Sequence, residues 1–196
     1  MSEHPQPVLI VEKKDDLLIL TLNRSDNANA LNPELVEALL HEIDKAVDIR
    51  LCVIRGNGRH FCAGFDLSDI EQCSDGDVLW RILRIELMLQ AIHHAPFPIV
   101  ALAHNQVVGA GADLFAACWL RVAAPDIKLK MPGWNFELSL GTRRLAKLAG
   151  AQAARDLLID TKTLNAQQSL GINLATDIVE PDQWDQLITE TLERTR

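Results

Sequence analysis

The sequence predicts an α/β domain in which helices cover a central β-sheet. Segments typical of strands and of helices alternate along the 196-residue chain, as in proteins whose helices pack against a sheet. Residues 99–102 form an apolar run without alternation, which is typical of a strand that is buried on both faces. No linker, low-complexity tract or internal repeat interrupts the pattern, so we expect a single domain over residues 1–196.

The predicted strands are short segments rich in β-branched and aliphatic residues. They cover residues 8–11, 17–22, 51–54, 99–102, 121–123 and 127–130. The first predicted helix has Asn32 as its N-cap and Pro33 at its first position, a favourable start for a helix. The other helices are predicted over 77–95, 109–120, 145–148, 151–159, 166–170 and 181–192. On helix 77–95, the side expected to face the core carries Leu79, Ile82, Leu83, Leu87 and Ile92.

The composition argues against several classes of protein. The net charge of −8 has the wrong sign for non-specific binding of nucleic acid. The four cysteines fit no zinc template, and no histidine spacing indicates a metal site. The N-terminus lacks the basic and apolar regions of a signal peptide, and polar residues interrupt the longest apolar stretch, 99–120. We therefore expect a reduced, cytoplasmic protein that binds no metal, nucleic acid or membrane.

A glycine-containing loop over residues 56–67 is the first candidate for a functional site. It follows a predicted strand, holds three glycines and ends close to an acidic residue, Asp66. Glycine permits backbone conformations that turn N–H groups outward, where they can hold an anion or a polarised carbonyl. The alternative is a plain turn between a strand and a helix.

The second candidate is the segment Gly109-Ala110-Gly111-Ala112-Asp113, which also follows a buried strand and opens a helix. Small residues let a ligand approach a helix N-terminus, where free N–H groups favour negative charge. The alternative is close packing of the helix. Since Leu114 occupies the third glycine position of GxGxxG, the dinucleotide-binding motif is absent.

Asp113 lies in the first turn of this otherwise apolar helix. Burial would raise the pKa of its carboxyl, which suits a general acid or base. The alternative is an acid that merely stabilises the helix start. His60 and His104 could also approach a ligand, although single histidines are more often structural or exposed. The basic cluster Arg143, Arg144 and Lys147 could meet ligand phosphates or could simply be solvated.

Several segments together form a more specific pattern than either glycine loop alone. They are Leu20-Thr21-Leu22-Asn23-Arg24, Asn29-Ala30-Leu31-Asn32, Phe61-Cys62-Ala63-Gly64-Phe65-Asp66-Leu67, Gly109-Ala110-Gly111-Ala112-Asp113-Leu114, Gly141-Thr142-Arg143-Arg144-Leu145 and Asn165-Ala166-Gln167-Gln168-Ser169-Leu170-Gly171. This combination resembles the crotonase (enoyl-CoA hydratase/isomerase) superfamily over nearly the whole chain. The resemblance implies a crotonase-like spiral of ββα units, the ClpP/crotonase fold. It also implies an acyl-CoA thioester as substrate and a role in fatty acid metabolism. Coenzyme A would be part of the substrate, with no separate cofactor, and the chain would form a homo-oligomer, a trimer or hexamer.

By matching position, the resemblance implies that the backbone N–H groups of Ala63 and Ala110 form an oxyanion hole. Two preorganised donors of this kind stabilise the enolate-like oxyanion of a thioester. Asp113 would be the catalytic carboxylate, acting on the α-carbon or on a water molecule. The residues expected to contact the substrate are Ala28, Ala30, Leu31, Ala63, Gly64, Phe65, Asp66, Gly109 and Ala110.

The sequence departs from the family pattern at one catalytic position. Hydratases of the family use two glutamates; Asp113 stands at the first position and Gly133 at the second. Hydration would then lack half of its acid–base pair, so lyase, isomerase or, best of all, decarboxylase-type chemistry is expected. The alternative is a non-catalytic, auxiliary subunit that binds CoA esters or pairs with an active paralogue. A peptidase of the related fold is disfavoured because no serine opens the helix at Gly111.

Two further departures concern length. The segment between Phe136 and Gly141 is shorter than in the family pattern. Family members usually continue with a C-terminal helical region that covers the active site, so a short form of the fold is expected. A missing cover would admit water to the site.

Overall fold

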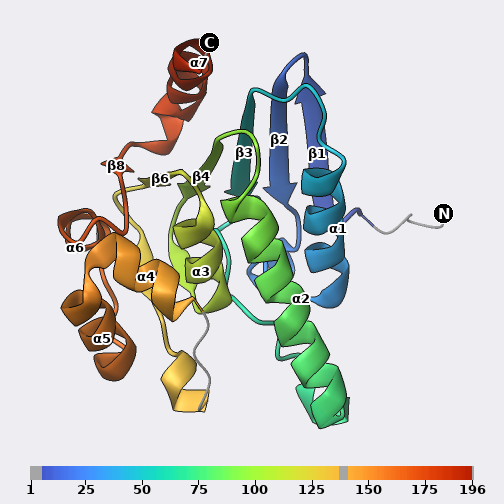
Figure 1. Ribbon diagram of the computed structural model, residues 1–196, viewed down its shortest axis with the longest axis vertical. Helices are drawn as coiled ribbons and strands as arrows, with labels where there is room; N and C mark the ends of the chain where they lie inside the picture. Colours follow the sequence, from blue (N-terminus) through green and yellow to red (C-terminus); the bar gives the residue numbers. More distant parts are fainter. Residues whose placement is uncertain (1–5, 137–140, 196) are drawn as a thin grey trace.

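The computed structural model describes residues 6–136 and 141–195 and is built around a six-stranded sheet (Figure 1). The strand order is β1-β2-β3-β4-β6-β8, with β1 antiparallel to β2 and all other neighbours parallel. The strands are β1 (Leu9–Lys14), β2 (Leu17–Leu22), β3 (Leu51–Gly56), β4 (Ile99–Ala103), β6 (Leu120–Ala123) and β8 (Asp177–Ile178). Strands β5 (Gln106–Val108) and β7 (Lys128–Lys130) form a second, parallel sheet.

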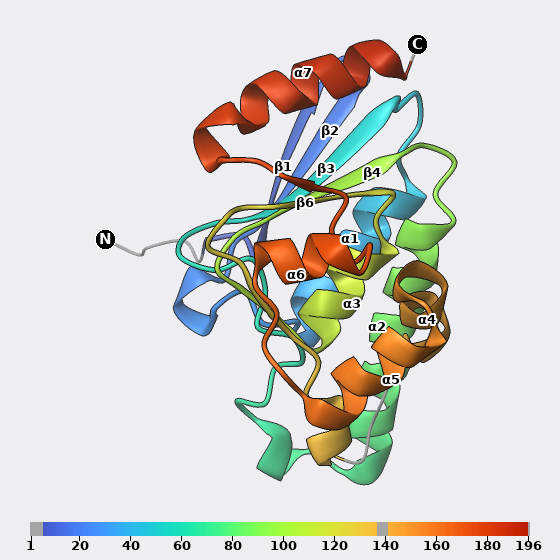
Figure 2. The same ribbon diagram turned by 90° about the vertical axis from the view of Figure 1, so that its left-hand side faces the viewer.

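Helices cover both faces of the large sheet, as the alternation of elements predicts. They are α1 (Pro33–Asp44), α2 (Asp75–His93), α3 (Ala110–Ala117), α4 (Thr142–Ala149), α5 (Ala151–Asp160), α6 (Ala166–Gly171) and α7 (Trp184–Arg194). Figure 2 shows α7 on one side of the sheet and α1, α2 and α3 on the other. Alternate strand residues follow this division: Leu20 and Ile54 face the main core, whereas Val53 and Leu102 pack with Ile188 of α7.

A ββα unit recurs along the chain, as expected for the spiral. Strand β4 is followed by β5 and α3, and β6 is followed by β7 and α4. After β3, Cys62 forms a single parallel bridge with Val107 of β5 before the chain reaches α2. The second sheet therefore lies between β4 and α3 and between β6 and α4 along the chain, and the segment after β3 joins it at Cys62.

The local sequence accounts for the starts of α1 and α2. Asn32 accepts a hydrogen bond from the Leu35 N–H at 3.0 Å, so the predicted N-cap is confirmed. Helix α2 begins at Asp75 rather than at residue 77, because Ser74 and Asp77 form a reciprocal capping box. The helix predicted over 109–120 ends at Ala117, and Leu120 already belongs to β6.

The predicted buried side of α2 is largely wrong. Its buried residues are Ile85, Met88, Leu89 and Ile92, of which only Ile92 was expected there. Leu79, Leu83 and Leu87 are 67%, 45% and 42% exposed. Two apolar stripes run along this helix, and helical spacing alone does not show which of them meets the sheet. The N-terminal half of α2 extends beyond the end of the sheet (Figure 1), which leaves its leucines uncovered.

Membrane-spanning character is not found in the part of the chain that the structure describes. None of the helices in residues 6–136 and 141–195 is both long and apolar enough to cross a bilayer.

Candidate active site

The two glycine segments predicted as candidates meet at Gly64. A Cβ added to Gly64 would lie 2.4 Å from the Val108 carbonyl oxygen and 3.1 Å from the Ala110 nitrogen. The φ angle of Gly64 is +93°, a conformation that residues with a side chain rarely adopt. Glycine is therefore required here, because the loop after β3 runs directly against the start of α3.

The Ala63 N–H does not have the role that was predicted for it. It donates a hydrogen bond to the Ala28 carbonyl at 2.9 Å, so this N–H is engaged within the protein. The prediction of Ala63 as an oxyanion donor is therefore wrong for this arrangement. The bond instead joins two predicted substrate-binding segments, residues 28–31 and 63–66.

The backbone N–H of Phe65, two residues further on, is a better candidate for the oxyanion donor. Leu31 donates to the Gly64 carbonyl at 2.7 Å and accepts from the Asp66 N–H at 3.3 Å, which makes a parallel bridge between Leu31 and Phe65. Successive N–H groups of an extended segment point to opposite edges, so the Phe65 N–H points away from Leu31. Within the described residues it has no hydrogen-bond partner, and neither has the N–H of Ala110, the first residue of α3.

A buried ion pair fixes the loop that carries Phe65. Arg24 Nη1 lies 2.7 Å from Asp66 Oδ2, with the two side chains 14% and 7% exposed, and the same guanidinium donates to the Ala30 carbonyl. Burial alone would raise the pKa of Asp66, but hydrogen bonds from Ser68 and Arg24 outweigh it and hold the pKa below its ordinary value. Asp66, predicted to contact the substrate, is thus engaged in holding the loop.

Asn29 completes this support. Its Oδ1 accepts from the Arg24 N–H at 2.8 Å, and its Nδ2 donates to the carbonyls of Asn57 and His60 at 2.9 and 2.7 Å. The side chain is fully buried, and its φ of 55° is one that asparagine tolerates better than most residues. The motif segments contain Arg24 and Asn29, but nothing in the sequence showed what they bind.

The start of α3 packs closely against the loop after β3. A Cβ on Gly111 would lie 2.4 Å from the Cys62 carbonyl oxygen, so a side chain there would push the helix away. Asp113, one turn beyond Ala110, is 5% exposed. Burial raises the pKa of its carboxyl to about 7; the Arg144 guanidinium opposes this rise and the Glu86 carboxylate adds to it. The prediction of a buried first-turn carboxyl is confirmed.

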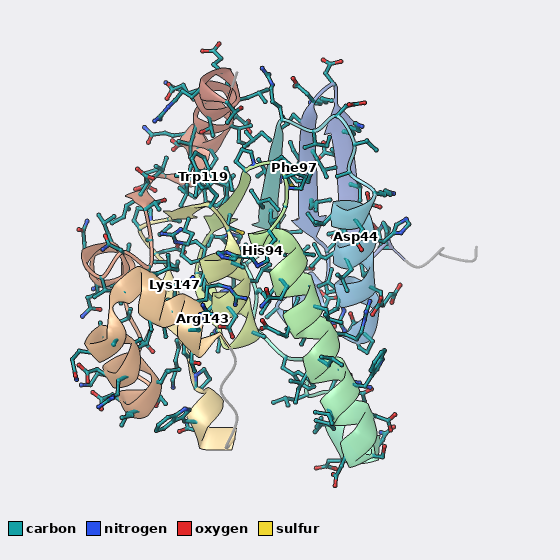
Figure 3. All side chains as sticks on the ribbon, in the orientation of Figure 1. Asp44, His94, Phe97, Trp119, Arg143 and Lys147 are labelled. Atoms are coloured by element: carbon teal, nitrogen blue, oxygen red, sulfur yellow. The ribbon has the colours of Figure 1, made fainter. Side chains whose placement is uncertain are left out.

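Asp113, Glu86 and Arg144 form a group that we call the acid cluster. A Cβ on Gly141 would lie 2.1 Å from Asp113 Oδ1 and 3.4 Å from Arg144 Nη1, so both side chains close over this glycine. Arg144 Nη2 lies 3.4 Å from Glu86 Oε1 of α2. Figure 3 places the labelled Arg143 and Lys147 on α4; both are exposed, whereas Arg144 between them turns inward.

The acid cluster contains one residue that the sequence did not single out. Glu86 is one of many polar residues on the predicted helix, and its contact with Arg144 joins positions 58 residues apart. Gly133 opens a short 3-10 helix (Gly133–Phe136) and offers no side chain. Most of the segment predicted to be shortened, residues 137–140, lies outside the described residues.

A cavity of about 360 Å³ lies on the Leu31 side of the bridge between Leu31 and Phe65. Residues of α1, α2 and a 3-10 turn (Ile70–Gln72) line it. It does not include the acid cluster. Its arginines are paired, Arg81 with Asp69 at 2.7 Å and Arg84 with Glu37 at 2.6 Å. Because neither Phe65 nor Ala110 lines it, the cavity lies beside the site and not at the unpartnered N–H groups.

Comparisons with known proteins identify the family of the chain. Residues 17–196 match the family model for enoyl-CoA hydratase/isomerase. A Mycobacterium tuberculosis protein described as an enoyl-CoA hydratase is 34% identical over 173 residues, which cover 86% of this chain and 69% of that protein. The 2,3-dehydroadipyl-CoA hydratase of Escherichia coli is 32% identical over 182 residues, covering 89% of this chain and 70% of the relative.

Solved structures show the same fold. A crystal structure from Bordetella parapertussis, described as an enoyl-CoA hydratase/isomerase, superposes with a TM-score of 0.95 at 40% identity, covering 97% of this chain and 80% of that one. An enoyl-CoA hydratase from Mycobacterium smegmatis gives a TM-score of 0.90 at 27% identity, covering 97% and 77% of the two chains. The family match, the relatives and the fold agree: this chain belongs to the enoyl-CoA hydratase/isomerase family of the crotonase superfamily.

Proposed function

We propose that the chain binds an acyl-CoA thioester with its carbonyl oxygen between the N–H groups of Phe65 and Ala110. The two N–H groups belong to adjacent backbones, since Gly64 lies directly against Ala110. Neither donates within the described residues. Donors that are already in place stabilise a developing oxyanion without reorganisation, which is the main source of rate enhancement in such sites.

Asp113 transfers a proton at the α-carbon of the bound thioester. With its pKa raised to about 7, it is present in both protonation states near neutral pH, as efficient acid–base catalysis requires. Loss of an α-proton leaves an enolate whose charge rests on the thioester oxygen, beside Phe65 and Ala110. The observation that carries this proposal is the position of a buried, perturbed carboxyl one helical turn from an unpartnered N–H.

A second candidate function is an auxiliary subunit that binds CoA esters without turnover. Gly133, which has no side chain to act as the second carboxylate, favours it. The two candidates differ in chemistry at the α-carbon, because binding alone exchanges no proton.

The test combines binding and proton exchange. Calorimetry compares butyryl-CoA with free CoA, and NMR follows deuterium exchange at the α-carbon of butyryl-CoA in D2O. We expect the thioester to bind more tightly than CoA, and Asp113→Asn to retain binding while exchange falls by about 100-fold or more. Glu190→Gln, an exposed change on α7, is the matched control. Wild-type exchange by Asp113→Asn would refute the role of Asp113, and binding without exchange in the wild type would favour the auxiliary subunit.

A further inference from the structure

Glu86 is placed to take part in the chemistry of the acid cluster. It lies on α2, and its carboxylate and that of Asp113 flank the Arg144 guanidinium. We propose that Glu86 is the second acid–base carboxylate of this site, and that it acts on a water molecule that adds to an α,β-unsaturated acyl-CoA. This inference rests on the proposed function, since it needs the oxyanion donors and Asp113.

The geometry ties Glu86 to Asp113 through one guanidinium. Arg144 Nη2 contacts Glu86 Oε1 at 3.4 Å, and Arg144 Nη1 lies near the Asp113 carboxyl over Gly141. The Arg144 side chain is 9% exposed, so it has little freedom to turn away. The negative charge of Glu86 disfavours ionisation of Asp113 and contributes to the raised pKa of that carboxyl. The two carboxyl groups therefore share one site although they come from different helices.

Two atoms of this cluster lack partners among residues 6–136 and 141–195. Glu86 Oε2 and Arg144 Nη1 are both buried, and no described residue forms a hydrogen bond with either. A buried carboxylate oxygen without a donor is costly, and such atoms in native proteins usually mark a bound water or a functional role. Glu86 Oε1, by contrast, accepts from Gln90 Nε2 at 2.5 Å. One oxygen of Glu86 is therefore held by Gln90 and Arg144, while the other has no donor among the described residues.

The reaction uses both carboxyl groups. Glu86 takes a proton from water as the water oxygen bonds to the β-carbon of the enoyl thioester. The π electrons move toward the thioester, whose carbonyl oxygen becomes the oxyanion held by Phe65 and Ala110. As the carbonyl re-forms, the α-carbon takes the proton of neutral Asp113. Glu86 is left protonated and Asp113 ionised, and proton exchange with solvent restores both groups.

The new element of this scheme is the position of the second carboxylate. Gly133 removes the carboxylate that the family pattern places after the inner strand, and Glu86 supplies one from α2. The chain would then hydrate enoyl-CoA thioesters, and dehydrate the corresponding 3-hydroxyacyl-CoA, with a rearranged acid–base pair.

Two assays on the full chain separate Glu86 from Asp113. One measures hydration of crotonyl-CoA by the loss of its conjugated absorbance, and the other measures α-deuterium exchange of butyryl-CoA. We expect Glu86→Gln to lower hydration by about 100-fold while it retains exchange and thioester binding. Asp113→Asn should lose both reactions. Glu86→Asp should recover part of the hydration rate, and Glu190→Gln should leave both reactions unchanged.

Other outcomes would overturn the inference. Hydration at the wild-type rate by Glu86→Gln would exclude a role in that reaction. An equal loss of hydration and exchange would show that Glu86 only supports Arg144 and Asp113. A wild-type protein that exchanges but does not hydrate would refute the inference and leave the proposed function intact, whereas one that does neither would refute both.

Discussion

The loop around Asp66 and the acid cluster around Asp113 both bury an aspartate beside an arginine, but they treat it in opposite ways. Asp66 lies 2.7 Å from Arg24 and accepts further hydrogen bonds, so it is held as an anion. Asp113 is equally buried, yet no ion pair within the described residues holds it, and its pKa rises to about 7. The first arrangement fixes a backbone; the second leaves a proton available for transfer.

Removal of Arg24 should have the largest effect on stability. Arg24→Met leaves the buried Asp66 carboxylate unpaired, which should lower the free energy of unfolding by about 3–5 kcal/mol. Urea denaturation measures the change. Arg50→Met is the matched control, because its pair with Asp16 has the same 2.7 Å distance but is more exposed; it should cost about 1 kcal/mol or less. Equal losses in the two variants would show that burial of the Arg24 pair is unimportant.

The pH dependence of stability should have opposite signs at the two aspartates. The pKa of Asp113 is raised from 3.8 to about 7, and it faces Arg144 of α4 and Glu86 of α2. The folded protein therefore keeps a proton that the unfolded chain loses, and stability falls as pH rises from about 4 to 7. Relative to the wild type, Asp113→Asn should gain on the order of 4 kcal/mol between pH 4 and pH 8.

Asp66 provides the contrast. Because its pKa is lowered, its contribution to stability is present above the ordinary pKa and is lost as the solution is acidified through the lowered value. Asp66→Asn should therefore be most destabilising near neutral pH and should approach the wild type in acid. Thermal melts of Asp113→Asn and Asp66→Asn from acid to neutral pH test this contrast. It would be contradicted if the stability of both variants, relative to the wild type, changed in the same direction with pH.

Gly64→Ala should break the contact between the two regions. The added Cβ would meet the Val108 carbonyl oxygen, and the backbone could no longer bring Phe65 beside Ala110. Loss of one oxyanion donor costs about 100-fold or more in kcat, so we expect α-proton exchange to fall by this factor. Gly171→Ala, where an added Cβ meets nothing within 4 Å, is the control. Retained exchange in Gly64→Ala would argue against Phe65 as a donor.

The smallest effect is expected on the exposed stripe of α2. Leu83→Ala should change stability by about 0.5 kcal/mol or less, whereas Leu89→Ala should cost about 2–5 kcal/mol because Leu89 is fully buried. Chemical denaturation measures the free energy of unfolding of both variants. A larger loss in Leu83→Ala than in Leu89→Ala would contradict this assignment of the buried side.

The sequence predicted the elements better than it predicted their contacts. Strand β2 and the N-cap at Asn32 depend on neighbouring residues, and both are confirmed. Strand β5 was missed because its three residues form a strand only by pairing with β7. The local sequence does not predict this pairing. The register of α2 failed for a related reason: two stripes of leucine and isoleucine look alike until the sheet is present.

The site shows the same division. Asp113 was found because a carboxyl in an apolar helix is locally unusual. Ala63 was assigned from the resemblance by matching position, and the sequence does not show that its N–H donates to the Ala28 carbonyl on another segment. Glu86 was missed because its significance comes from Arg144, which lies far along the chain.

The repetition of the ββα unit also sets the spacing of the proposed donors. Phe65 and Ala110 follow Cys62 and Val107 at the same distance along the chain, and these two residues form a parallel bridge, so the two N–H groups occupy successive turns of the spiral. Neighbouring strands lie about 4.7–4.9 Å apart in a sheet. Backbone hydrogen bonds maintain this distance, so it does not depend on particular side chains. A substitution at position 65 or 110 by any residue except proline would therefore change the side chains around a substrate while both proposed N–H donors remain.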